Sequence, residues 1–224
     1  MTPRLPVGCV IAVLGAESSG KTALALAIAE RLQQRGIAAV AVGEYLREWC
    51  DCEGRTPRPE EQGAIAAEQT RRIADAAARG VAVADTTALM TAVYSDMLFN
   101  DDTLYAAALA AQRGYAITLL TALDLPWVAE GLQRDGPHVR EPVDARVRAA
   151  LGRAAVPFSV VHGSGQDRLT SAWNAINSIA ARAELAGDTG RSGSESGWRW
   201  PCDKCSDPAC EHRLFSDLVA RAPK

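Results

Sequence analysis

An excess of charge of either sign is missing from this sequence of 224 residues. Its 24 Lys and Arg residues stand against 27 Asp and Glu residues, which leaves a formal net charge of −3, and the isoelectric point is near 5.7. Nucleic acids and anionic membranes attract strongly basic surfaces. The charge balance therefore argues against both as partners and favours a small-molecule substrate.

Long apolar runs are missing as well. No run approaches the roughly 18 residues that a membrane-spanning helix needs. Arg4 and the apolar stretch 7–16 resemble a short signal peptide, but cleavage there would remove the glycine-rich loop that follows, so we reject that interpretation and expect a cytoplasmic protein. In such a reducing compartment the six cysteines suit metal binding better than a disulfide framework.

Lysine is scarce. Lys21, Lys204 and Lys224 are the only lysines among the 24 basic residues. Lys21 lies in GAESSGKT (15–22), which has the G-x-x-x-x-G-K-T form of a phosphate-binding loop and follows an apolar run. In such a loop Gly15 and Gly20 supply the turns, Lys21 reaches the terminal phosphates, and the Thr22 hydroxyl binds Mg²⁺. An ordinary strand-to-helix turn is the alternative interpretation.

Short apolar runs alternate with longer helical patterns as far as residue 185. This alternation predicts an α/β fold of the P-loop NTPase type, with a parallel five-stranded sheet flanked by helices. The expected strands span 8–14, 37–42, 80–84, 115–120 and 157–161. The expected helices span 20–35, 59–78, 86–97, 102–112, 142–153 and 168–185. We therefore expect a kinase-like ATP-binding domain at 1–185, a flexible linker at 186–197 that is rich in Gly, Ser and charge, and a small tail at 198–224.

Two acidic residues follow expected strands. Asp85 directly follows the apolar run 81–84, at the carboxyl end of a strand, where open α/β sheets bind their ligands and where a carboxylate could hold Mg²⁺ through water. Capping of the next helix is a compatible alternative role for Asp85. Glu44 could accept a proton from a hydroxyl acceptor or bind its ribose, and Arg47 could meet a phosphate. A solvent-facing ion pair between Glu44 and Arg47 is the alternative.

The turn-rich segment 126–141 contains Arg134, His138 and Arg140. Phosphoryl transfer needs cations on the developing charge and exclusion of water, and an arginine-bearing lid provides both. We therefore interpret this segment as a lid. Solvated loop arginines are the alternative.

Four segments in order carry a resemblance to a known family. They are GAESSGKT, EYLRE (44–48), ADTTALMTAVY (84–94) and LDLPWVAEGLQRDG (123–136). Together they resemble the nicotinamide riboside kinase domain of the bacterial NadR-type proteins and the related AAA-type ATP-binding domains. The resemblance covers about residues 8–183. It implies ATP, Mg²⁺ and transfer of the terminal phosphate to a nucleoside-like hydroxyl, as in NAD metabolism.

The same resemblance implies a set of site residues. Those that would bind the triphosphate are Gly15, Glu17, Ser18, Ser19, Gly20, Lys21 and Thr22. Asp85 would face the acceptor or the metal. The acceptor side would be lined by Glu44, Tyr45 and Arg47, and the lid would contribute Arg134 and Arg140.

The sequence departs from the family pattern at two aromatic positions that would stack on a nicotinamide ring. The residue before EYLRE is Gly43, and the position in the helix before the Asp85 strand is about Thr70. Stacking of about 1 to 3 kcal/mol per ring is absent from these positions. Tyr45 and Trp49 are the candidate substitutes.

The tail contains the spacing C-x2-C-x4-C-x-H, formed by Cys202, Cys205, Cys210 and His212. Three thiolates and one imidazole suit a tetrahedral structural Zn²⁺, whose binding would fold a short knuckle. A redox dithiol and unrelated reduced thiols are the alternatives.

Three functions remain open at this point. The first is a small-molecule kinase that uses ATP and Mg²⁺. The second is a regulatory P-loop ATPase or ATP-binding module whose zinc tail engages a protein partner. In the third, the tail serves only for self-association into a zinc-tethered oligomer.

Overall fold

The computed structural model describes residues 2–128 and 136–188, with side chains as far as residue 182. Arg134 of the expected lid lies outside the described residues. So do the four predicted zinc ligands of the tail, Cys202, Cys205, Cys210 and His212, and the expected linker from residue 189 onward.

Five strands form one parallel sheet with the order β2-β3-β1-β4-β5. They are β1 (Val10–Leu14), β2 (Ala39–Val42), β3 (Val81–Asp85), β4 (Ile117–Thr121) and β5 (Ser159–Val161). The predicted five-stranded parallel sheet is confirmed. Each strand begins one or two residues later than its apolar run.

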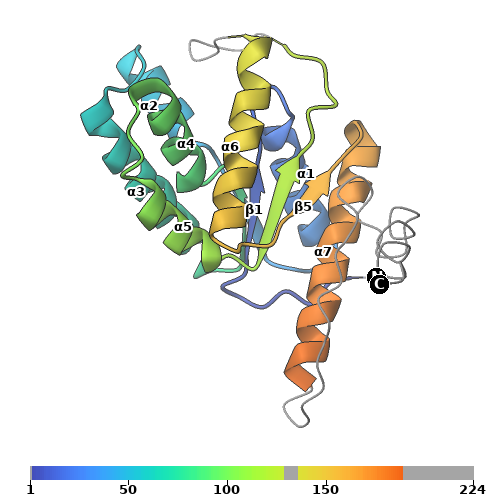
Figure 1. Ribbon diagram of the computed structural model, residues 1–224. Coiled ribbons are helices and arrows are strands. Elements are labelled where there is room, and N and C mark those ends of the chain that lie inside the picture. The colour runs from blue at the N-terminus through green and yellow to red at the C-terminus, as the bar shows by residue number, and fades with distance from the viewer. Residues whose placement is uncertain (1, 129–135, 189–224) are drawn as a thin grey trace, which may run out of the picture.

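Helices cover both faces of this sheet. They are α1 (Lys21–Gln33), α2 (Tyr45–Glu53), α3 (Pro59–Ala77), α4 (Ala88–Phe99), α5 (Tyr105–Arg113), α6 (Arg140–Arg153) and α7 (Gly165–Asp188). Helices α1 and α7 pack on one face, and α3, α4 and α6 pack on the other, with α2 and α5 outside them (Figure 1). None of the helices in the described ranges is apolar over a length that would cross a bilayer.

The core follows from the two-residue period of the strands. Ile11 and Val13 of β1 pack against α1 and α7, whereas Leu14 packs against α4 and α6, and all three are wholly buried. Alternate side chains of a strand point to opposite faces of a sheet, so a sheet covered on both faces needs apolar residues at every position. This requirement explains the uninterrupted apolar runs in the sequence.

Helix α2 is an α-helix that the sequence patterns did not predict. Its sequence is YLREWCDCE, in which only Leu46 and Cys50 are buried. These two residues lie four positions apart and form a single contact line on the helix, which is too short a pattern to recognise without the neighbouring helix.

The start of α4 also differs from the expected helix at 86–97. Its N-cap is Thr87, whose hydroxyl accepts a hydrogen bond from the Leu89 N–H at 3.3 Å. Asp85 is the last residue of β3, and Thr86, with a φ of 78°, separates it from the helix. The alternative role of Asp85 as a helix cap is therefore wrong, and its carboxylate remains at the carboxyl edge of the sheet.

Two leucines of α4 test the assignment of the core. Leu89 is wholly buried and Leu98 is 58% exposed. We expect Leu89→Ala to lower the free energy of unfolding by about 3 kcal/mol and Leu98→Ala to lower it by less than about 0.5 kcal/mol. Urea unfolding followed by circular dichroism measures both. Equal losses in the two variants would contradict the packing described here.

Candidate active site

The predicted phosphate loop connects β1 to α1 through an unusual backbone. Gly15 and Gly20 have φ values of 148° and 77°, and Ser18 also has a positive φ of 51°. A Cβ atom on Gly15 would lie 2.0 Å from Oγ1 of Thr121. The chain passes so close to β4 that only glycine fits at position 15. It then turns into α1, where the N–H groups at the helix start can bind an anion.

Two buried hydroxyl groups hold this loop in place. Ser19 is wholly buried, and its Oγ donates to the Ala16 carbonyl at 2.6 Å. The Thr121 hydroxyl at the end of β4 lies 2.7 Å from Ser19 Oγ and 3.1 Å from the Leu14 carbonyl. Thr121 therefore connects β4, the end of β1 and the loop. The sequence analysis missed it, because a threonine that ends a strand has no distinguishing pattern.

Lys21 is the first residue of α1 and is half-buried. Its ammonium group donates to the Ala16 carbonyl at 2.9 Å, which places the charge above the loop. Thr22 follows it and is exposed. The cation and the hydroxyl therefore lie together at the start of the helix, as the loop motif predicts.

Asp85 connects the predicted motifs. Its side chain is 3% exposed, and burial raises its pKa above the ordinary range. The hydrogen bond with Thr22 and the charges of Lys21 and Arg47 lower this pKa, while the charge of Glu44 raises it further. The phosphate loop, the end of β3 and the start of α2 therefore converge on one carboxylate.

The donor atoms of this cluster fit a magnesium ion. Carboxylate and hydroxyl oxygens, the types that Mg²⁺ prefers, are supplied by Asp85 and Thr22. Oδ1 of Asp85 is buried and has no hydrogen-bond partner among the described residues. Those residues contain no group of three or more His, Cys, Asp or Glu side chains that could hold a metal ion, and a magnesium ion bound here would complete its coordination with water and phosphate oxygens.

Glu44 is the N-cap residue of α2, and its carboxylate makes no capping hydrogen bond. Oε2 lies 3.3 Å from an Arg47 guanidinium nitrogen, so the ion pair considered from the sequence is present. The Glu44 side chain is only 13% exposed, against 45% for Arg47. Glu44 is therefore covered rather than solvent-facing, and its role in proton transfer stays a prediction.

The segment 123–128, where the expected lid begins, crosses the phosphate loop. The Ser18 hydroxyl donates to the Val128 carbonyl at 2.6 Å. A Cβ atom on Gly20 would lie 3.0 Å from a methyl group of Leu125. The base of the lid segment is thus in contact with the loop that it is expected to cover.

Arg140 is buried at the first position of α6, with 7% of its surface exposed. One guanidinium nitrogen donates to the Leu125 carbonyl at 2.9 Å. Nε and Nη2 have no hydrogen-bond partner in the described part of the chain. A buried cation with unused donors is costly, and it suits a site that receives an anion. His138, in the 3-10 turn η1 (Pro137–Val139), is exposed.

Arg168 of α7 is a further residue at this site that the sequence analysis missed. It is 3% exposed and donates to the carbonyl groups of Ser19 at 2.9 Å and Gly163 at 2.7 Å. It also forms an ion pair with Asp124, which accepts a hydrogen bond from the Gly163 N–H at 2.6 Å. Burial lowers the pKa of Arg168, and the Asp124 charge opposes this effect. These residues are far apart in sequence, so no local pattern reveals the cluster.

The candidate aromatic rings on the acceptor side are each covered on one face. The Arg72 guanidinium carbon lies 4.3 Å from the centroid of the Tyr45 ring, and that of Arg55 lies 4.8 Å from the Trp49 ring. Thr70 uses its hydroxyl within α3, in a 2.9 Å bond to the carbonyl one turn earlier. Stacking of a ligand on both faces of either ring would require the arginine to move.

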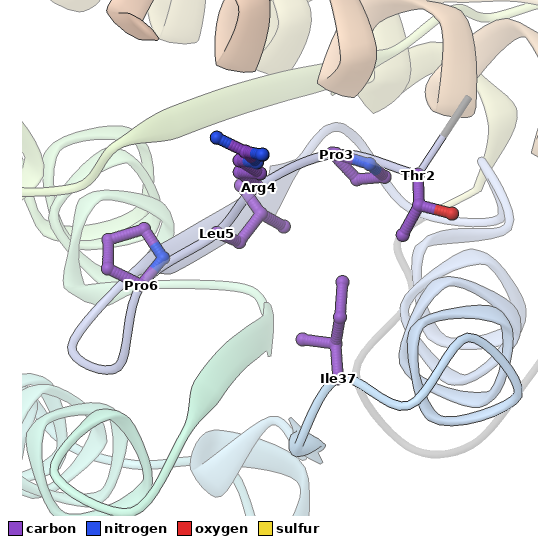
Figure 2. Close-up of a pocket in the computed structure, with 6 residues that line it drawn as sticks. All are labelled: Thr2, Pro3, Arg4, Leu5, Pro6 and Ile37. Carbon is purple, nitrogen blue, oxygen red and sulfur yellow. The ribbon is translucent and has the colours of Figure 1, made fainter.

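A second depression lies away from these residues. It is lined by residues 2–6 and Ile37 (Figure 2). Ile37 precedes β2, and residues 2–6 precede β1, so this hollow lies at the amino edge of the sheet, opposite the phosphate loop. It is separate from the candidate active site.

Comparison with known proteins places the fold. The family described as AAA domain matches residues 10–168, and no curated protein matches the sequence. A NadR protein solved in complex with NR superposes with a TM-score of 0.61 and 18% identity, covering 78% of this chain and 51% of that chain. A NadR protein in complex with NAD and AMP-PNP superposes with a TM-score of 0.62 and 16% identity, covering 78% of this chain and 50% of that chain.

A third similar structure is a deoxyadenosine kinase from M. mycoides with dCMP and dCDP bound. Its TM-score is 0.52 at 15% identity, with 75% of this chain and 99% of that chain covered. The present chain spans about half the length of the NadR chains. At these identities the likeness is one of fold, and it confirms the predicted resemblance to NadR-type proteins at that level.

Two glycines test the phosphate loop. We expect Gly15→Ala to weaken MgATP binding by about 100-fold or more, because the new methyl group would collide with Thr121 and distort the loop. Gly152 of α6 has no atom within 4 Å of its Cβ position, so Gly152→Ala should leave binding unchanged and add about 0.5 to 1 kcal/mol of stability. Isothermal titration calorimetry and urea unfolding measure the two effects. Wild-type affinity in Gly15→Ala would contradict the loop geometry.

Asp85 predicts a pH dependence of stability. Its raised pKa means that the folded protein holds this proton to higher pH than the unfolded chain, so its contribution to folding falls as pH rises from about 4 through the folded pKa. Asp85→Asn should therefore be more stable than the wild type by about 1 kcal/mol at pH 8 without Mg²⁺ or nucleotide, and the gap should shrink toward pH 4.

Urea unfolding at both pH values provides the measurement. Asp75→Asn is the matched control, since Asp75 is 53% exposed and pairs with Arg71 on the surface of α3. Its stability should change little between the two pH values. A less stable Asp85→Asn variant at pH 8 would show that the buried carboxylate is not a cost to folding.

Proposed function

This chain belongs to the family of AAA domains, and we propose that it is a kinase that uses ATP and Mg²⁺ to phosphorylate a nucleoside-like hydroxyl group. The observation that carries the proposal is the position of Asp85, which interacts with Thr22 and Lys21 on the phosphate-loop side and with Glu44 and Arg47 on the α2 side. A donor half and an acceptor half meet at this carboxylate. A module that only binds ATP has no need for a covered carboxylate such as Glu44 on the second side.

On the donor side the loop backbone and Lys21 would bind the triphosphate. Thr22 and Asp85 would hold Mg²⁺. The metal would neutralise charge on the phosphate oxygens during transfer. The donors of Arg140, buried beside Leu125, would turn toward the same charge once the nucleotide is bound. Arg134, in the same lid segment, is proposed to add a second cation.

On the acceptor side Glu44 would act as the general base. The acceptor hydroxyl oxygen forms a bond to the terminal phosphorus, the bond from that phosphorus to the bridging oxygen breaks, and ADP leaves. The hydroxyl proton passes to the Glu44 carboxylate. Tyr45 and Arg47 would border the acceptor, with Arg47 holding the Glu44 side chain in place before the substrate arrives.

The similar structures support a nucleoside-like acceptor. The NadR protein was solved with NR, and the deoxyadenosine kinase with dCMP and dCDP. Nicotinamide riboside is therefore the first acceptor that we propose. The rings of Tyr45 and Trp49, each covered by an arginine, favour an acceptor ring that is held along its edge over one that is stacked on both faces.

A nucleoside panel tests this function. Purified full-length protein is incubated with ATP, Mg²⁺ and one nucleoside at a time, and ADP and phosphorylated nucleoside are followed by mass spectrometry. We expect ADP to form with a selected acceptor, and Lys21→Ala to reduce the rate by about 100-fold or more. Arg79→Ala, which removes an exposed cation at the end of α3, is the charge-matched control and should retain the wild-type rate.

The other outcomes are equally informative. ADP that forms at the same rate without any acceptor would replace the kinase by a regulatory ATPase. Full activity in Lys21→Ala would refute the phosphate-loop assignment itself. ATP binding without turnover under any condition would indicate a binding module, whose partner would then be sought through the tail.

A further inference from the structure

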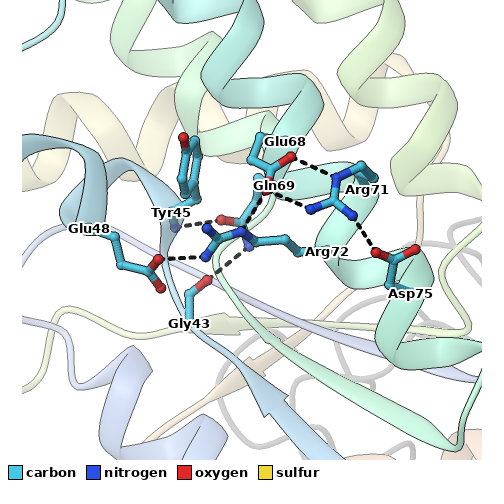
Figure 3. A network of polar contacts seen from close by, with 8 residues as sticks. All are labelled: Gly43, Tyr45, Glu48, Glu68, Gln69, Arg71, Arg72 and Asp75. Atoms are coloured by element: carbon cyan, nitrogen blue, oxygen red, sulfur yellow. Dashed lines mark hydrogen bonds and ion pairs between the residues drawn. The ribbon is translucent and has the colours of Figure 1, made fainter. Parts of the chain in front are cut away.

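The side-chain amide of Gln69 joins three backbone segments at the carboxyl edge of the sheet. Gln69 is 2% exposed and lies on the buried face of α3. Its Oε1 accepts from the Tyr45 N–H at 2.7 Å, and its Nε2 donates to the carbonyl groups of Gly43 at 3.2 Å and Thr86 at 3.4 Å. Figure 3 shows the amide between Gly43 and Tyr45. Both ends of the amide are therefore used.

Two of these bonds bracket Glu44. Gly43 precedes this residue and Tyr45 follows it, so one buried amide holds the backbone on both sides of the proposed general base. Tyr45 is also the first residue of α2, whose N-terminal N–H groups have no partner within the helix. Gln69 accepts from one of these groups, the Tyr45 N–H, and the Glu44 carboxylate makes no capping bond to the helix. It is directed instead toward Arg47 and Asp85.

The third bond reaches the residue after Asp85. Thr86 has a φ of 78°, a conformation that costs a β-branched residue about 1 to 3 kcal/mol and that persists only where the surroundings impose it. Its N–H donates to the Val13 carbonyl at 3.0 Å, and its carbonyl accepts from Gln69. The same amide therefore restrains the segments that carry both Glu44 and Asp85.

The surface ion pairs of Arg72 are weaker candidates for holding the segments around Glu44 and Asp85 in place. Arg72 pairs with Glu48 at 2.5 Å and with Glu68 at 2.9 Å, but the Arg72 and Glu48 side chains are 32% and 53% exposed. Solvent-exposed ion pairs contribute little because water and salt screen them. Loss of the buried Gln69 amide removes a partner from one backbone N–H and two carbonyl groups, which is more costly. Gln69 is therefore the group on which the local geometry depends.

We infer that Gln69 is a positioning residue that holds the Glu44 carboxylate at the acceptor hydroxyl and in register with Asp85. The inference rests on the proposed kinase function and adds a residue that the phosphate-loop and lid motifs do not contain. Gln69 does not touch the reacting atoms. Its effect on the rate should pass chiefly through Glu44, because Gln69 binds the backbone on both sides of Glu44, whereas Thr86, after Asp85, is also held by the Val13 carbonyl. This condition separates Gln69 from a residue that only stabilises the fold.

A double-mutant cycle tests this condition. The variants Gln69→Leu, Glu44→Gln and the pair are assayed with ATP, Mg²⁺ and nicotinamide riboside, or the better acceptor from the nucleoside panel. We expect Gln69→Leu to lower kcat by about 10-fold to 100-fold, with the MgATP dissociation constant within about twofold of wild type. In the Glu44→Gln background the same change should lower kcat by less than about twofold, because the group it positions is already lost.

Gln112→Leu is the matched control. Gln112 is wholly buried in α5 and makes two side-chain bonds of similar length, to Thr87 at 2.8 Å and to Thr118 at 2.9 Å. The Gln112→Leu variant should lose about as much free energy of unfolding in urea as Gln69→Leu loses. Its kcat should stay within about twofold of wild type. Gln69→Met, an unbranched replacement, is measured in parallel so that the result does not depend on one variant folding well.

The outcomes separate the inference from the function on which it rests. Equal kcat losses from Gln69→Leu in the wild-type and Glu44→Gln backgrounds would overturn the positioning role while leaving the kinase intact. Equal kcat losses from Gln69→Leu and Gln112→Leu would also overturn the positioning role and leave the kinase function intact. A wild-type protein that phosphorylates no nucleoside would refute the proposed function and, with it, the reaction that Gln69 is inferred to serve.

Discussion

The close approach of the chain at Gly15 to Thr121 is the constraint on which the rest of the site depends. A phosphate loop must turn its N–H groups toward one point, and here it can do so only because position 15 has no side chain and β4 lies beside β1. Thr121 and Ser19 then hold the loop through buried hydroxyl groups. Arg168 reaches the Ser19 carbonyl from α7. The strand order of the sheet therefore determines the shape of the loop.

Arg168 and Asp85 are buried charged groups at the carboxyl edge of the sheet that differ in how fully their polar atoms are paired. This difference indicates their roles. Arg168 has Asp124 and two carbonyl groups as partners, so its burial is compensated and the group serves structure. One carboxylate oxygen of Asp85 has no hydrogen-bond partner within the described ranges. Such a group costs stability and is retained where a ligand supplies the missing interaction. Arg140 is the cationic counterpart, because two of its guanidinium nitrogens have no hydrogen-bond partner among the described residues and a bound anion would supply one.

The two halves of the site are held by different means. The donor half is held by the sheet itself, through the loop between β1 and α1. The acceptor half is held from α3, by a neutral amide that contacts backbone groups around Glu44 and Thr86. A neutral amide can fix two carboxylates side by side without adding a charge to a region where Asp85 and Glu44 already repel each other.

The sequence by itself determined the five parallel strands, the phosphate loop with Lys21 and Thr22, and the placement of Asp85 at a strand end, because each of these is written in a local pattern of a few residues. It did not predict α2, because a helix with only two buried residues has no clear periodicity. It also offered a capping role for Asp85 that Thr87 performs, because a left-handed residue displaces the start of α4. Only the tertiary structure decided that Gln69, Thr121 and Arg168 converge on the loop and its neighbours. A buried amide, hydroxyl or guanidinium group acquires its role from the groups that folding places beside it, and those groups come from distant parts of the chain.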